Sequence, residues 1–173
     1  SPRQDEPVLA EDGGTLPTGT RLAEFELIKV LGDGGFGVVY LAHDHSLGRT
    51  VALKEYMPSS FARRIGMAVS ARSAQHGATY AAGLRSFVNE AQLLARFDHP
   101  SLVKVYRFWE GNGTAYMVMP FYEGVTLKQR LRELGAPPSQ AWLGQLLEPL
   151  IDALATIHAE NCFHRDISPD NII

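Results

Sequence analysis

The sequence predicts an α+β fold in which five antiparallel strands form a sheet, one long helix packs against it, and further helices follow. Three observations lead to this prediction. Short β-rich runs alternate with glycine-rich or polar turns, a helical period appears over 86–97, and a broad apolar stripe marks 140–160. The 173 residues are 45% hydrophobic and 20% charged, which is typical of a globular chain.

The N-terminal half begins with a leader, residues 1–20, that has several prolines and acids, no apolar period, and is expected to be flexible. Three strands rich in β-branched and aromatic residues are then expected, at 25–31, 38–42 and 50–54. The stretch 56–80 interrupts this rhythm with Pro58, small residues and several arginines. It is predicted to be a basic, irregular insertion.

The next elements are a helix and a strand pair. Apolar residues recur at helical spacing over 86–97, and His99-Pro100 ends the pattern. Strands are then expected at 102–109 and 114–119, because the intervening Asn112-Gly113 is a strong hairpin signal. These two strands complete the predicted sheet.

Two more helices are expected at the C-terminal end, a short one near 127–134 and a longer one over 140–160. The apolar stripe of the longer helix runs from Trp142 to Ile157 and needs a partner surface. We expect this stripe to hold two copies together as a homodimer, mainly through Trp142, Leu146, Leu150, Leu154 and their neighbours.

Composition excludes several classes of function. The net charge is −3 and no long block of one sign stands out, so a nucleic-acid partner is not expected. No apolar run is long enough to cross a membrane. Cys162 is the single cysteine, which rules out an intrachain disulfide and favours a reducing, cytoplasmic setting.

A glycine motif, G-x-G-x-x-G, spans Gly32 to Gly37. In a dinucleotide-binding fold a helix begins at these glycines, whereas here the chain continues as Val38-Val39-Tyr40-Leu41-Ala42, a strand pattern. Glycines in such a hairpin let backbone amides approach phosphate oxygens closely. The motif therefore indicates a phosphate-covering turn.

Four elements in order resemble the protein kinase signature: the glycine turn, Lys54 in Val-Ala-Leu-Lys, Glu90 on the following helix, and His164-Arg165-Asp166 through Asn171. The sequences Gly-Asp-Gly-Gly-Phe-Gly and Ile-Ser-Pro-Asp are most similar to bacterial serine/threonine kinases. The resemblance implies a small lobe over 21–119, including the 56–80 insertion. It also implies a hinge and partial large lobe over 120–173, ending in the catalytic loop.

The resemblance implies roles for individual residues. Lys54 would hold the ATP phosphates and pair with Glu90, and Asp166 would accept or orient the proton of the substrate hydroxyl. Asn171 would bind Mg²⁺ through its amide oxygen. The residues implied to contact the nucleotide are Leu31, Gly32, Gly34, Gly35, Phe36, Gly37, Val39, Ala52, Lys54, Met119, Pro120, Tyr122 and Ile173.

The implied activity is ATP-dependent phosphoryl transfer to serine or threonine hydroxyls of a protein substrate. The Asp-Phe-Gly segment of the family is absent from these 173 residues, so we expect the chain to be a truncated, inactive part of a kinase. Ser168 stands where such kinases usually have a lysine, and the interval from Lys54 to Glu90 is unusually long. Two alternatives stay open: a non-catalytic, nucleotide-binding pseudokinase and a protein-interaction module.

Overall fold

The main sheet has six strands, all pairing antiparallel with their neighbours, in the order β1-β2-β3-β4-β8-β7. The computed structural model describes residues 14–164 and 167–173. The five predicted strands are present as β2, β3, β4, β7 and β8, and the two-residue β1 adds an edge. The strands are β1 (Arg21–Leu22), β2 (Phe25–Gly34), β3 (Gly37–Asp44), β4 (Arg49–Tyr56), β7 (Arg107–Gly111) and β8 (Thr114–Pro120).

The prediction of an irregular segment over 56–80 is wrong. This stretch forms a two-stranded hairpin, β5 (Ala62–Ile65) and β6 (Ala68–Ala71), followed by the short 3-10 helix η1 (Ala74–His76). Gly66, with a φ of 59°, lies in the turn between the strands. The sequence of β5 shows no clear alternation of apolar and polar residues, because an arginine lies on its buried side. From the sequence alone an arginine is expected to be solvated.

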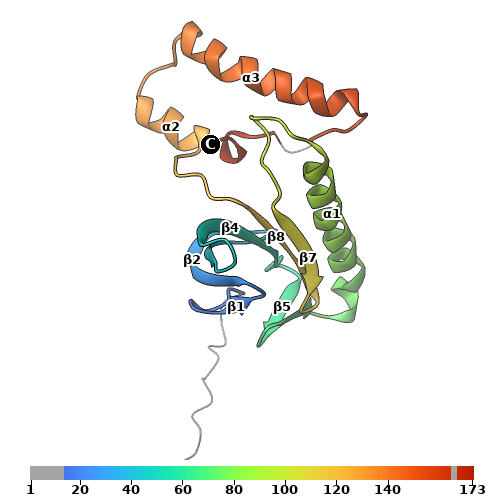
Figure 1. The fold of residues 1–173 in the computed structure, drawn as a ribbon. Coiled ribbons are helices and arrows are strands. Elements are labelled where there is room, and N and C mark those ends of the chain that lie inside the picture. The colour runs from blue at the N-terminus through green and yellow to red at the C-terminus, as the bar shows by residue number, and fades with distance from the viewer. Residues whose placement is uncertain (1–13, 165–166) are drawn as a thin grey trace, which may run out of the picture.

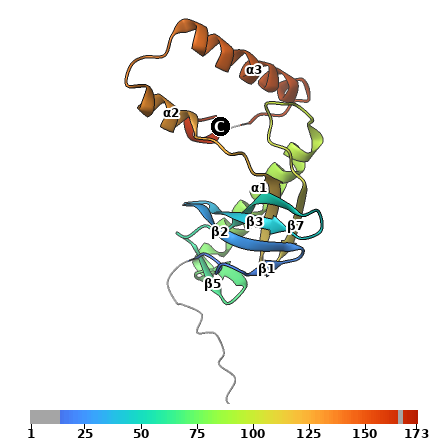
Figure 2. The same cartoon turned by 60° about the vertical axis from the view of Figure 1, so that its left-hand side comes forward.

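The long helix α1 (Gly77–Arg96) begins well before Ser86, where the sequence pattern placed its start. Tyr80, Phe87 and Ala91 are its buried residues, and they pack it against the sheet, where it contacts β8. Figures 1 and 2 show α1 running along one face of the sheet. The first turns contain alanines and Gly83, which are too small to give a clear helical spacing of large apolar residues.

Strand β7 starts at Arg107, later than the predicted Leu102. Tyr106 N donates to Val118 O, but the ladder with β8 itself runs from Arg107 opposite Val118 to Gly111 opposite Thr114. The predicted Asn112-Gly113 turn is confirmed. Both residues have positive φ, 55° and 75°, as the tight hairpin turn requires.

The two C-terminal helices are α2 (Leu127–Leu134) and α3 (Gln140–Ala159), and the 3-10 helix η2 (Pro169–Asn171) follows. Figures 1 and 2 show α2 and α3 together beyond one end of the sheet, with η2 close to α2. None of the described helices is long and apolar enough to cross a membrane.

The most exposed part of the apolar stripe of α3 is not the row that was expected to dominate the contact. Ala153 and Ile157 are buried, whereas Trp142, Leu146, Leu150 and Leu154 are only partly covered. The most exposed apolar residues lie beside that row, at Leu143 (37%), Leu147 (43%) and Ile151 (61%). Their spacing of four residues places them on one face of the helix.

Candidate active site

The glycine motif forms the β2–β3 hairpin, in which Gly34 lies opposite Gly37 and Gly35-Phe36 makes the turn. A Cβ atom added at Gly32, Gly34 or Gly35 would have no heavy atom within 4 Å. A Cβ at Gly37 would lie 2.3 Å from Glu55 O on β4. The first three glycines therefore border open space, and the last one is required by packing.

Lys54 and Glu90 meet despite the long interval between them. Lys54 Nζ lies 3.7 Å from Glu90 Oε1 and 5.6 Å from the centroid of the Phe87 ring. The two side chains are 30% and 50% exposed, so this ion pair contributes little to stability. Its importance is positional, because it holds the amino group of Lys54 on the strand next to the glycine hairpin, opposite Val39.

Three of the residues implied to contact the nucleotide, Val39, Ala52 and Met119, share one sheet face with Lys54. Val39 lies opposite Lys54 in the β3–β4 ladder, and Ala52 lies opposite Met119 in the β4–β8 ladder. Residues two apart on one strand point to the same side, so all four side chains project from the same surface. Leu31, at the outer end of β2, is exposed.

The predicted hinge leaves the sheet at Pro120, the last residue of β8. Tyr122 lies just beyond it and is exposed. Ile173, also exposed, reaches back to this segment, because its Cγ2 lies 3.0 Å from where a Cβ on Gly124 would be. Ile173, which is implied to contact the nucleotide, and the segment after Pro120 are therefore neighbours.

The segment after α3 carries the remaining candidates. Asp166 lies outside the described residues, and Asn171 ends η2. The adjacent Asp170 makes an ion pair of 2.8 Å with Lys128 Nζ, and Leu127 N donates to Ile172 O at 2.8 Å. These contacts dock the segment that contains Asn171 on the start of α2.

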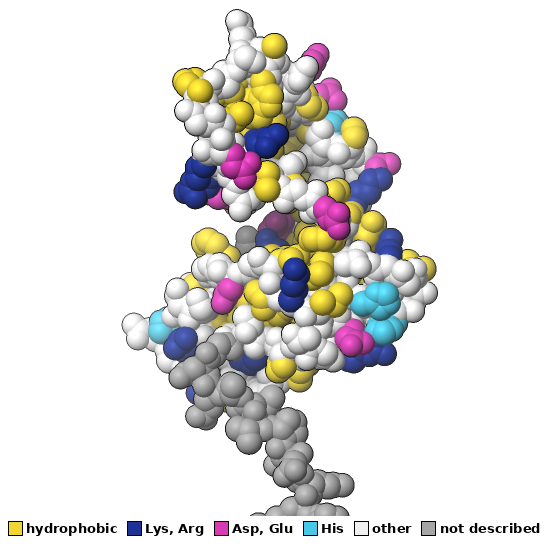
Figure 3. Space-filling model, turned by 90° about the vertical axis from the view of Figure 1, so that its left-hand side faces the viewer, with side chains coloured by type: hydrophobic (Ala, Val, Ile, Leu, Met, Phe, Trp, Pro, Cys, Tyr) yellow, Lys and Arg dark blue, Asp and Glu magenta, His cyan; other side chains and the backbone are white. Residues whose placement is uncertain are grey.

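A cleft separates the sheet from α2 and α3, and Figure 3 shows the surface hollowed there, with hydrophobic side chains gathered around the hollow. The donor types present suit a magnesium nucleotide. Open space beside three glycines leaves room for phosphates, Lys54 offers a cation, and Asn171 offers a hard amide oxygen.

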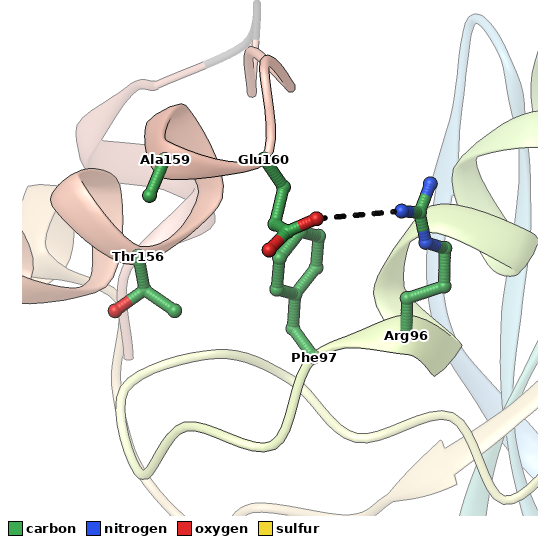
Figure 4. Close-up of a pocket in the computed structure, with 5 residues that line it drawn as sticks. All are labelled: Arg96, Phe97, Thr156, Ala159 and Glu160. Atoms are coloured by element: carbon green, nitrogen blue, oxygen red, sulfur yellow. Dashed lines mark ion pairs between the residues drawn. The ribbon is translucent and has the colours of Figure 1, made fainter.

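A different cavity, about 440 Å³, lies between the C-terminal ends of α1 and α3. Figure 4 shows Arg96 and Glu160 facing each other across it, with Arg96 Nη2 3.8 Å from Glu160 Oε2. Nearby, His99 Nε2 lies 2.8 Å from Asp152 Oδ2, and Ser101 N donates to His99 Nδ1. These contacts join the C-terminal end of α1 to α3. Sequence reasoning missed them, since His99-Pro100 was interpreted only as a helix end.

Sequence reasoning also missed Glu55, the neighbour of Lys54 on β4. Its side chain points to the opposite sheet face and is fully buried. There it accepts hydrogen bonds from Arg64 Nη2 at 2.5 Å and from the Tyr40 hydroxyl at 3.1 Å. Burial, with the nearby Glu55 carboxylate second, raises the pKa of Tyr40 well above its ordinary value.

The comparisons with known proteins agree on one family. A family model described as "Protein kinase domain" matches residues 25–173. The chain is 35% identical over 148 residues to "Serine/threonine-protein kinase pkn2" of Myxococcus xanthus, covering 86% of this chain and 16% of that protein. It is 32% identical over 150 residues to "Serine/threonine-protein kinase PrkC" of Bacillus subtilis, covering 86% and 20%.

Solved structures give the same result. The "PpkA-294 apo form" structure is 51% identical with a TM-score of 0.86, covering 92% of this chain and 57% of that one. The kinase domain of PknI from Mycobacterium tuberculosis, at 23% identity and a TM-score of 0.69, shares the fold over 91% of this chain and 56% of its own. The chain thus spans only part of each of these relatives.

Proposed function

The chain belongs to the protein kinase family, and on that premise we propose that it is the ATP-binding part of a serine/threonine kinase of the bacterial type. The observation that carries the proposal is the 3.7 Å approach of Lys54 Nζ to Glu90 Oε1, on the strand next to a glycine hairpin that has open space at Gly32, Gly34 and Gly35. The proposed reaction moves the γ-phosphoryl group of ATP to a serine or threonine hydroxyl of a protein substrate.

Lys54 binds the α- and β-phosphates in this proposal. Glu90 holds the lysine amino group in place before the nucleotide binds. Binding therefore does not have to restrict the motion of the lysine side chain. The backbone amides of Gly34 and Gly35 approach the phosphates, because no side chain stands between them. These groups bind and orient the phosphates and do not take part in bond formation.

Asp166 and Asn171 belong to the catalytic loop in this assignment. Asp166 accepts the proton of the substrate hydroxyl, as a positioned carboxylate can. Asn171 supplies an amide oxygen to Mg²⁺, which, when bound, neutralises charge on the phosphates. The docking of the neighbouring Asp170 on Lys128 supports a defined position for Asn171.

The adenine pocket that we propose uses the shared sheet face and the hinge. The ring lies between Leu31, Val39 and Ala52 above and Ile173 below, with Met119 at the back of the pocket. The Pro120 carbonyl accepts a hydrogen bond, which does not require the N–H that proline lacks. Tyr122 supplies both an amide N–H and a carbonyl. The register of β3, β4 and β8 supports this set.

We place the small lobe at 21–119 and the hinge with the first part of the large lobe at 120–173. ATP is an intracellular metabolite, so the proposed activity implies a cytoplasmic location.

We further propose that two copies of the 173-residue chain associate through α3, because Leu143, Leu147 and Ile151 form an exposed apolar row on one helix face.

Nucleotide binding and phosphoryl transfer are tested separately. We expect the 173-residue chain to bind ATP with Mg²⁺ in calorimetry, and Lys54→Met to weaken binding about tenfold or more through loss of a charged contact. Transfer to a generic protein substrate is expected to be absent until the chain is extended through the Asp-Phe-Gly segment, and Asp166→Ala is expected to abolish it there. Binding without transfer by the extended chain would favour a pseudokinase, and no binding by either chain would favour an interaction module.

A further inference from the structure

The hairpin β5–β6 is joined to the sheet by a buried ion pair. Arg64 Nη2 lies 2.5 Å from Glu55 Oε2, and the two side chains are 8% and 0% exposed. Glu55 Oε1 has no hydrogen bond with any described residue, and Arg64 and Tyr40 both donate to Oε2 of this carboxylate. Arg64 also donates through Nε to Gly14 O and through Nη1 to Met67 O.

The base of the hairpin is closed by a second arginine. Arg72 Nε donates to Ser59 O and to Ala62 O, and Arg72 N donates to Phe61 O. The chain then enters η1 and α1 with only Ser73 between Arg72 and η1. A shift of the hairpin is therefore passed directly to the start of α1.

The first turns of α1 pack against the end of β4 and the β7–β8 turn. The Tyr56 hydroxyl, at the end of β4, donates to Tyr80 O at 3.0 Å, and the Tyr80 hydroxyl donates to Gly113 O at 2.6 Å. Gly83 passes so close that an added Cβ would lie 2.1 Å from the Tyr56 hydroxyl. The β7–β8 turn is held from the other side, since Val69 N donates to Asn112 O.

Two neighbouring residues of β4 thus form ion pairs on opposite faces of the sheet. On one face Lys54 reaches Glu90 of α1, and on the other Glu55 holds Arg64 of the hairpin that leads into α1. Glu90 lies ten residues beyond Tyr80, roughly 15 Å along a helix, so a small tilt at the hairpin moves the Glu90 carboxylate appreciably.

From this arrangement we propose that Arg64 is a positioning residue: by clamping the β5–β6 hairpin to Glu55 it holds α1 in the orientation that places Glu90 against Lys54. A buried ion pair adds little net stability compared with apolar residues of similar size, but its directed hydrogen bonds specify one geometry. The proposal rests on the proposed ATP-binding function, and the insertion is the element that aligns the site.

The test is a double-mutant cycle on nucleotide affinity in the 173-residue chain. Arg64→Met is measured by calorimetry with ATP and Mg²⁺ in the wild-type and in the Lys54→Met backgrounds. We expect a loss of about tenfold in the first background and no further loss in the second, because Arg64 acts through the Lys54 contact. Arg63→Met is the matched control, since Arg63 is the exposed neighbour on β5, and it is expected to change neither affinity.

A second variant covers the case in which Arg64→Met does not fold. The double change Glu55→Met with Arg64→Met removes both buried charges and is expected to melt at or above the temperature of the wild type. We expect its ATP affinity to stay about tenfold weak, because apolar packing does not direct the hairpin. Wild-type affinity in this folded variant would overturn the proposal, as would equal losses from Arg64→Met in both backgrounds.

Hydrogen exchange separates this proposal from the proposed function. In the double methionine variant without nucleotide, amide exchange in α1 around Glu90 is expected to rise, while the β2–β3 hairpin exchanges as in the wild type. Unchanged α1 exchange would contradict the positioning role even if ATP binds. Absence of ATP binding by the wild type, with α1 exchange raised in the variant, would refute the proposed function and leave the mechanical role of Arg64 standing.

Discussion

Individual glycines in the candidate site have different physical roles although they belong to one motif. Gly37 lies opposite Tyr56 in the β3–β4 ladder, where a Cβ would meet the backbone of Glu55. Gly34 faces open space and so has no packing reason to be glycine. The sequence motif does not distinguish these two glycines. Their surroundings do, because Gly37 is required for packing and Gly34 leaves space for a ligand.

This difference gives a prediction. Gly37→Ala is expected to destabilise the fold by about 1–3 kcal/mol, because backbone atoms cannot move aside as a flexible side chain can. Gly34→Ala is expected to leave stability within about 0.5 kcal/mol and to weaken ATP binding, because its methyl group occupies the space assigned to phosphate. Urea unfolding and calorimetry on both variants measure the two effects. Equal stability of the two variants would contradict the packing assignment.

At the scale of elements, α1 is attached to the sheet by tyrosines. The rings of Tyr56 and Tyr80 contact each other at a tilt of 44°, with 5.3 Å between their centroids, and the hydroxyl of each donates to a backbone carbonyl. Burial raises the pKa of Tyr56 to about 12 and also raises the pKa of Tyr80. The helix that carries Glu90 therefore depends on phenols that stay protonated.

Stability should consequently fall in alkali. The raised pKa of Tyr56 means that the folded state keeps a proton which the unfolded state loses near pH 10. Its contribution is complete below pH 10 and is lost as the pH rises from 10 towards about 12. We expect Tyr56→Phe to make this loss shallower in urea unfolding at neutral pH and at about pH 11. Tyr122→Phe, at an exposed position, is the control, and an equal change in both variants would refute the assignment.

At the scale of the whole molecule, α3 leaves its apolar row uncovered in the single chain. The contacts His99–Asp152 and Arg96–Glu160 join α3 to the end of α1. Leu143, Leu147 and Ile151 remain among the exposed hydrophobic residues. Each large apolar side chain that becomes fully buried contributes roughly 1.5–3 kcal/mol, so this row favours association.

We expect the 173-residue chain to sediment as a dimer at micromolar concentration. Ile151→Asp is expected to give monomers, because it places a charge in the centre of the row. Ile173→Asp, another exposed apolar position but away from α3, serves as the control and is expected to leave the dimer intact. A monomeric wild-type chain would rule out association through α3. If residues added after Ile173 abolish the dimer, the added part of the large lobe covers the same face.

The sequence by itself determined those features that depend on neighbouring residues. The Asn112-Gly113 turn, the strand that carries Lys54 and the start of α2 all follow from local conformational preference, and the structure has each of them. The family resemblance also followed from the sequence, because its signature is a set of local motifs in a fixed order.

The tertiary structure alone decided which distant residues meet. Arg64 looked like a solvated base, since an arginine is buried only when a partner such as Glu55 satisfies it, and no local pattern names that partner. The start of α1 depended on Tyr56 and Gly83 fitting together, and the exposed row on α3 depended on what else packs there. Long-range contacts of this kind arise when whole elements pack together. The type of a single residue and its local spacing therefore do not predict them.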